Sequence, residues 1–214
     1  MSLYTPRSFA AGNRIAVARL MHDHPFATLV TPTAPEMCIS HLPLLFVPGC
    51  EPHGTLIGHF ARANPHWLQA TAAESIAVFH GPHAYVSPRW YAHPDKMVPT
   101  WNYAVVHAHG TLEIIADPVE TRSVLDVLVH RFEHDRPEPW HFDMPPRESD
   151  AMVGAIVAFR MRIKRLDAKF KLSQNRTAED RDRVVAGLLA DEHADALATA
   201  TWMQLDASGQ QDPS

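Results

Sequence analysis

The stretch that most constrains the fold is AIVAFRMRIKRLDAK, residues 155–169, in which apolar and basic side chains alternate. The apolar positions share one side of an extended chain and the basic positions share the other: Val157, Phe159, Met161 and Ile163 against Arg160, Arg162 and Lys164. A period of two predicts a long strand with one face buried and one face toward water. A sheet therefore organises this chain.

Several further segments have the length and composition of strands or helices. Strands are predicted at 26–31, 54–60, 75–81, 83–87 and 105–115, with more strand-length apolar runs between 35 and 49; helices are predicted at 8–23, 117–133 and 178–193. Ser8 is the expected cap of the first helix, Asp117 caps the second, and Gly81-Pro82 is expected to turn between two strands. Because helices do not separate the strands one by one, we expect a β-barrel with peripheral helices instead of a doubly wound sheet.

Length and charge limit the possible classes of protein. A chain of 214 residues suits a single domain, which we place at 1–195, with 196–214 as a disordered or loosely packed tail. Its apolar runs are too short to span a membrane, and the N-terminus lacks the plan of a signal peptide, so we expect a cytoplasmic protein. The net charge of −5 argues against a general nucleic-acid binder, although a local basic patch remains open.

The sequence lacks the familiar catalytic and metal-binding motifs. It has no Gly-x-Ser-x-Gly elbow and no nucleotide-binding glycine motif. The two cysteines match no zinc spacing, and the His107/His109 pair has no acidic or cysteine partner close in sequence. We therefore predict no catalytic residue and no metal ligand.

Two stretches are candidates for binding an anion. GHFARANPHW, residues 58–67, brings His59, Arg62 and Asn64 to the point where a strand enters a short helix, although a surface ion pair would also explain Arg62. Residues 160–176 hold seven Lys or Arg against one acid, Asp167. This basic stretch would bind phosphate or nucleic acid, or it would form the solvated face of a strand.

The segment VSPRWYAHPDKMVPTWNY, residues 86–103, concentrates aromatic side chains between prolines. It holds two of the five tryptophans and two of the four tyrosines. Loops are usually polar, so these rings either plug a core or form a wall for a flat ligand.

Several segments together resemble one family: YTPRSF, HLPLLF, GHFARANPHW, VFHGPHAYVSPRWY, VPTWNYAVVHAHG and KFKLSQN, in that order. The chain is similar, from about Tyr4 to Leu189, to the PaiB family of FMN-binding negative transcriptional regulators. The resemblance implies an FMN-binding split barrel with six antiparallel, Greek-key-like strands. It also implies a homodimer with FMN at the subunit interface.

The resemblance suggests roles for residues that were ambiguous alone. The expected cofactor-binding residues are His59, Arg62, Asn64, Ser87, Trp90, Thr100, Trp101, Asn102, Lys169, Lys171 and Gln174. Arg62 and His59 suit the phosphate; Ser87, Thr100 and Asn102 suit the ribityl chain or flavin edge; Trp90, Trp101 or Tyr103 suit the ring; Lys169, Lys171 and Gln174 would close the site.

The resemblance leaves three functions open. The first is a PaiB-type transcriptional repressor without enzymatic activity, which would contact DNA through a local basic patch. The second is an FMN-dependent oxidoreductase of the flavin reductase or pyridoxamine phosphate oxidase kind, because FMN carries the redox chemistry itself. The third is a haem-binding split-barrel protein.

Overall fold

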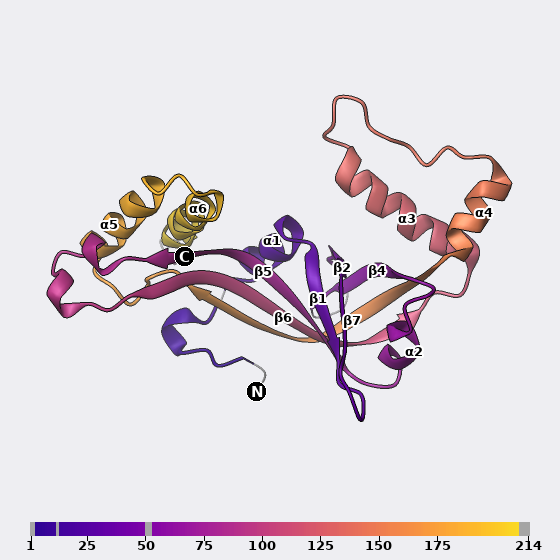
Figure 1. The fold of residues 1–214 in the computed structure, drawn as a ribbon, viewed down its shortest axis with the longest axis horizontal. Helices are drawn as coiled ribbons and strands as arrows, with labels where there is room; N and C mark the ends of the chain where they lie inside the picture. The colour runs from indigo at the N-terminus through magenta and orange to yellow at the C-terminus, as the bar shows by residue number, and fades with distance from the viewer. Residues whose placement is uncertain (1–2, 12, 50–52, 210–214) are drawn as a thin grey trace. The chain divides into compact units, whose positions relative to one another are not determined.

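The computed structural model describes residues 3–11, 13–49 and 53–209 (Figure 1). The chain divides into two compact units, each built from separate segments. Unit 1 comprises Met1–His24, His80–Val106 and Asp167–Ser214, and unit 2 comprises Pro25–Phe79 and His107–Leu166. Among the described residues, no helix is long and apolar enough to cross a membrane.

The strands form a seven-stranded sheet in the order β2-β1-β5-β6-β7-β4-β3. Their bounds are β1 Phe26–Thr31, β2 Cys38–Pro43, β3 Leu45–Val47, β4 Thr55–Ala61, β5 Ser75–Val86, β6 Thr100–Ile114 and β7 Ile156–Lys171. Strand β1 pairs antiparallel with β2 and β5, and β4 pairs antiparallel with β3 and β7. The expected antiparallel split-barrel fold is confirmed, with seven strands instead of six because the three-residue β3 pairs with β4.

The helices are α1 Arg14–Asp23, α2 His66–Ala70, α3 Pro118–Glu133, α4 Pro146–Gly154, α5 Ala178–Leu189 and α6 Ala194–Gly209; short 3-10 turns lie at Arg7–Phe9, Pro88–Trp90 and Pro94–Lys96. In unit 2, α3 begins as predicted, with the Asp117 carboxylate accepting from the Val119 N–H. Val124 and Leu128 of this helix pack on Leu45, Ile115 and Ala158 to form a buried apolar cluster.

Strand β7 has the predicted alternation over its first half. Val157, Phe159, Met161 and Ile163 are buried. Arg162 and Lys164 of the opposite face are exposed, and Arg160 is half-buried. The period of two in the sequence therefore corresponds to a strand with one buried apolar face and one basic face toward water.

Two local predictions were wrong. The first helix begins at Arg14 and not near Ser8, because the Asn13 side chain accepts from the backbone N–H groups of Ile15 and Ala16. Gly81-Pro82 makes no turn and lies within the continuous strand β5. A Cβ atom at Gly81 would lie 2.8 Å from a methyl carbon of Leu20, so this glycine permits close packing.

The predicted loose tail at 196–214 is also wrong where the structure describes it. Residues 194–209 form α6, which lies beside α5 in unit 1 (Figure 1). Ala196, Ala200 and Met203 of α6 are buried at helical spacing, together with Trp202. Residues 210–214 lie outside the described part of the chain.

Candidate functional site

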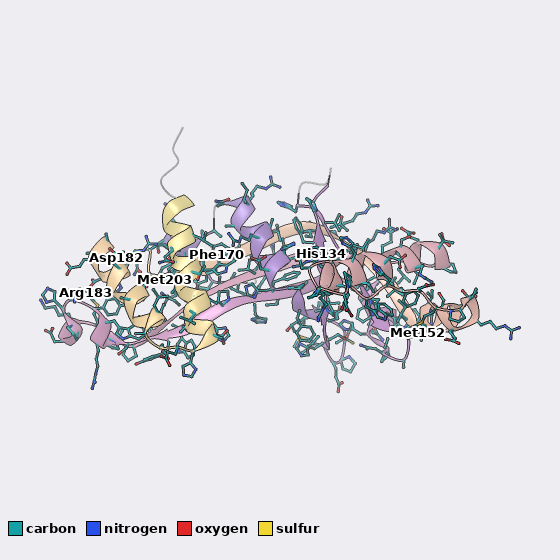
Figure 2. All side chains as sticks on the ribbon, turned by 90° about the horizontal axis from the view of Figure 1, so that it is seen from above. His134, Met152, Phe170, Asp182, Arg183 and Met203 are labelled. Carbon is teal, nitrogen blue, oxygen red and sulfur yellow. The ribbon has the colours of Figure 1, made fainter. Side chains whose placement is uncertain are left out.

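Three strands of unit 1 place a set of aromatic and basic side chains together. We call this set the aromatic–lysine face: His83 and Tyr85 of β5, Trp101 and Tyr103 of β6, and Lys169 and Lys171 of β7. Within each strand the two members are two residues apart, so they share a side of the sheet. Phe170 of β7, between the two lysines, is labelled in Figure 2.

Trp101 is the largest flat surface of this face. Its side chain is 51% exposed, and its ring centroid lies 6.0 Å from that of His83 and 6.3 Å from that of Tyr85. Trp101, His83 and Tyr103 border a cavity of about 390 Å³. Sites for drug-sized ligands typically enclose about 300–1,000 Å³. The exposure of the ring beside this cavity fits a wall for a flat ligand better than a core plug.

Lys169 is buried without an acidic partner among the residues that the structure describes. The residue is 8% exposed, and its ammonium nitrogen lies 5.3 Å from the ring centroid of Tyr103 and 5.5 Å from that of Tyr4. Aromatic faces attract a cation but do not neutralise it. An anion would complete the surroundings of this ammonium.

Lys171 adds a second cation beside the wall. Its ammonium donates to the Thr100 hydroxyl at 2.6 Å and to the Trp101 carbonyl at 2.5 Å. Burial lowers the pKa of Lys171 from its ordinary value, and the positive charges of Lys169 and Arg176 lower it further. The cations of this region therefore repel one another, which a bound anion would relieve.

Asn102 and Gln174, two further predicted contacts, have internal partners. Asn102 is 1% exposed and its amide donates to the Ser173 hydroxyl at 2.9 Å and to the Met203 sulfur at 3.3 Å. Gln174 donates to the Phe170 carbonyl and accepts from the Leu172 N–H, at 2.6 and 2.8 Å. Both side chains fix the turn that follows β7, and so hold the end of the strand that carries Lys171.

Ser87 and Trp90 lie in the segment between β5 and β6. The Ser87 hydroxyl accepts from the Arg89 N–H at 3.3 Å and so caps the turn Pro88–Trp90. The Trp90 ring covers Gly187 of α5 so closely that a Cβ atom there would lie 2.3 Å from it. Trp90 thus has a packing contact that Trp101 lacks.

His59, Arg62 and Asn64 belong to unit 2. Arg62 donates to the carbonyls of Gly154 and Ile156, at 2.5 and 2.6 Å. These two bonds account for the position of its guanidinium without a surface ion pair. Burial lowers the pKa of His59, and its buried Nδ1 atom has no hydrogen-bond partner within the described chain.

Asn64 belongs to a buried network around His66. The Asn64 amide donates to the Ser40 hydroxyl at 3.0 Å, and its carbonyl oxygen accepts from the His66 N–H at 3.0 Å. The two ring nitrogens of His66 lie 2.8 Å from the hydroxyls of Ser40 and Thr31. Burial lowers the pKa of His66, which favours the neutral form of the ring in this network.

The first half of the basic stretch pairs with acids of unit 2. Arg160 forms an ion pair with Glu120. Arg162 lies 3.8 Å from Glu113, and Lys164 lies 3.8 Å from Glu74. These residues form a solvated strand face, which is one of the two interpretations that the sequence allowed. Within the described ranges, no group of three or more His, Cys, Asp or Glu is arranged to hold a metal ion.

Comparisons with known proteins show which family this chain belongs to. Residues 3–165 match the model of a family described as "Putative FMN-binding domain". The chain is 32% identical over 204 residues to "Protease synthase and sporulation protein PAI 2" of Bacillus subtilis strain 168, covering 94% of this chain and 97% of the relative.

Two solved structures share the fold at low sequence identity. The first is the FAD and heme binding protein from Mycobacterium smegmatis, with a TM-score of 0.60 and 18% identity over 83% of this chain and 79% of that one. The second is the flavocytochrome Anf3 from Azotobacter vinelandii, with a TM-score of 0.59 and 13% identity over 84% and 78%.

Sequence reasoning named four of the six residues of the aromatic–lysine face. Trp101, Tyr103, Lys169 and Lys171 were expected as ligand contacts, and the structure brings them together. His83 and Tyr85 were not expected in this role. Their signal was present, because exposed ring-bearing residues two apart on a strand mark one face of a sheet.

Proposed function

This chain belongs to the family of FMN-binding domains, and from that premise we propose that FMN binds on the aromatic–lysine face of a PaiB-type regulator of transcription. The observation that carries this placement is Lys169, whose ammonium is buried against two aromatic rings and has no carboxylate partner among the described residues.

The residues of the face fit the parts of FMN. The flavin ring needs a flat, mainly apolar wall, which Trp101 and Tyr103 supply. Its phosphate needs cationic donors, which Lys169 and Lys171 supply. FMN brings redox chemistry when bound, and the chain contributes binding and orientation. His59, Arg62 and Asn64 stay predicted contacts of the other unit.

The decisive experiment compares FMN with riboflavin, which has the same ring system but no phosphate. Purified protein should show flavin absorption near about 370 and 450 nm, the bands expected of the cofactor. After flavin removal, FMN should bind at least about tenfold more tightly than riboflavin, because ionic hydrogen bonds contribute about 1.5–3 kcal/mol. Absence of a flavin spectrum together with failure to bind added FMN would refute the proposal.

The regulatory role rests on the PaiB resemblance and on the similarity to the B. subtilis relative. Acids pair with Arg160, Arg162 and Lys164, and Lys169 and Lys171 are assigned to the FMN phosphate. We therefore expect DNA to contact this stretch near its end, at Arg176. Direct DNA binding should be sequence-selective and weaken steeply with added salt. A mobility-shift titration against promoter fragments at two salt concentrations tests this role.

An FMN-dependent oxidoreductase is the second candidate, and the position of Lys171 favours it. If Lys169 alone holds the phosphate and Lys171 lies beside the flavin ring, the charge of Lys171 would stabilise the reduced, anionic form of the cofactor. Anaerobic bleaching of the 450 nm band by NADH or NADPH, with no promoter binding, would support this candidate over the regulator.

We also propose a homodimer. On the outer face of β1 and β2, Phe26 and Ile39 are 66% and 56% exposed. Exposed large apolar residues on one face of a sheet are typical of protein–protein contacts. Light scattering should report twice the chain mass of 23.9 kDa. Ile39→Glu should shift the protein toward the monomer, and a wild-type monomer would contradict the proposal.

A further inference from the structure

A second cavity in unit 1 shares no residue with the aromatic–lysine face. It encloses about 340 Å³ and is bordered by the N-terminal segment, the end of β7 and helix α6. Helices α5 and α6 lie beyond residues 3–165, where the chain matches the FMN-binding family. The cavity therefore uses parts of the chain that the family match does not include.

The inner wall of this cavity is aromatic. Phe170 and Trp202 are 3% and 7% exposed, and their rings meet edge to face with centroids 5.5 Å apart. Ile15 and Leu205 also border the cavity, and they are 80% and 37% exposed. Apolar side chains on both the wall and the rim suit a ligand with a flat apolar body.

One carboxylate, that of Asp206, borders the cavity. Its side chain is 19% exposed and lies 3.5 Å from the guanidinium of Arg181. Burial raises the pKa of Asp206, an effect that Arg181 and a hydrogen bond with Gln174 only partly offset. Two carboxylate oxygens offer about four acceptor positions, and part of this side chain is exposed, so a further donor can reach it.

Three other polar groups that border the cavity have partners within the chain: Asn13, Arg19 and Gln174. The Asn13 side chain accepts from the N–H groups of Ile15 and Ala16. Arg19 pairs with Asp23 at 3.2 Å. Neither group is poised for an anionic ligand, so the ligand preference is set by Asp206.

We propose that this cavity is a second ligand site, separate from the flavin, for a small aromatic amine. The ring of the ligand would pack on Trp202 and Phe170, and its ammonium group would bind the Asp206 carboxylate. An ammonium near an aromatic face gains further attraction from the ring. A carboxylate ligand would meet Asp206 with like charge and bind weakly.

Three indole probes of similar size test the proposed charge preference: tryptamine, the uncharged tryptophol and the anionic indole-3-propionate. Calorimetric titration of the full chain should rank them in that order, with tryptamine at least tenfold tighter than the anion. Equal affinities, tighter binding of the anion, or no binding of any probe would overturn the proposal.

Variants then locate the site. Asp206→Asn should weaken tryptamine at least tenfold and leave tryptophol nearly unchanged. Arg181→Gln removes the charged partner of Asp206 and should tighten tryptamine several-fold. Asp182→Asn, at an exposed acid of α5 (Figure 2), is the matched control and should change neither affinity.

A steric variant covers the case in which Asp206→Asn fails to fold. Ala16→Leu fills the cavity from α1 without changing its charge, so it should abolish binding of both tryptamine and tryptophol. The FMN affinity of this variant should equal that of the wild type, because the two sites share no residue. Undiminished tryptamine binding by Ala16→Leu would refute the placement.

Discussion

Replacing Trp101 with alanine should release FMN from a chain that stays folded. The indole is the largest exposed flat surface of the aromatic–lysine face, at 51% exposure. Stacking of a heteroaromatic ring on an aromatic side chain contributes about 1–3 kcal/mol, measured by alanine substitution at nucleic-acid sites. This corresponds to a rise in the FMN dissociation constant of about 5- to 150-fold.

The same substitution should cost little stability. The ring contacts of Trp101 are those with His83 and Tyr85, at centroid separations of 6.0 and 6.3 Å. Half of the side chain is already in water, so we expect a loss of about 1 kcal/mol. For a chain of this size that lowers the melting temperature by about 2–4 °C.

Trp90→Ala is the matched control, because its ring covers Gly187. It should lower the free energy of unfolding by about 2–4 kcal/mol, near the range for losing a large aromatic side chain, and leave the FMN affinity of the folded protein unchanged. Flavin fluorescence titration and urea unfolding of both variants are the measurements. If Trp101→Ala unfolds the chain while keeping FMN affinity in the folded fraction, the wall assignment is wrong.

Three further outcomes follow from particular contacts. Lys169→Met keeps the apolar stem and removes the charge, so FMN should bind at least about tenfold more weakly while riboflavin binding changes little; equal losses for both ligands would contradict the phosphate assignment. Gly187→Ala should lower the free energy of unfolding by about 1–3 kcal/mol, because the new Cβ atom would lie 2.3 Å from the Trp90 ring, and urea unfolding measures this. Stability should also fall as pH drops below about 6.5, since burial lowers the folded-state pKa of His59 and His66 and the unfolded chain then binds more protons; urea midpoints at pH 7.5 and 5.5 should differ less in His66→Gln.

Much of the fold could be read from local patterns. Helix α3 carries its start signal in Asp117 and Pro118, and strand β7 carries its two faces in a period of two. Strand β1 was predicted at its observed bounds, Phe26–Thr31. Each of these elements has a signal within its own residues, which is why sequence reasoning succeeded there.

The wrong predictions came where two local signals competed or where polar neighbours hid an apolar pattern. Gly81-Pro82 has the composition of a turn, yet tertiary packing against Leu20 keeps β5 extended. Ser8 and Asn13 are both good caps, and only the structure shows that Asn13 is used. The polar end of the chain hid the apolar spacing of Ala196, Ala200 and Met203 that holds α6 in place.

The candidate site was predictable in its residue types but not in its electrostatics. Thr100 and Lys171 are far apart in sequence, and only the pairing of β6 with β7 brings the hydroxyl and the ammonium to 2.6 Å. The burial of Lys169 likewise depends on Tyr4 and Tyr103, which come from different parts of the chain. A sequence shows that a lysine is present, but not which of the described side chains surround its ammonium group.

The two lysines predict that FMN affinity decreases at alkaline pH. In the free protein, burial and neighbouring cations lower the pKa of Lys171. A bound phosphate would raise the pKa of Lys171 again. At any pH above the pKa of Lys171 in the free protein, FMN binding would therefore require Lys171 to take up a proton. FMN affinity should therefore fall as pH rises toward the ordinary lysine pKa of about 10.4. Riboflavin affinity should change less over the same range, and Lys171→Met should remove most of the difference. Identical pH profiles for the two ligands would show that the phosphate lies away from these lysines.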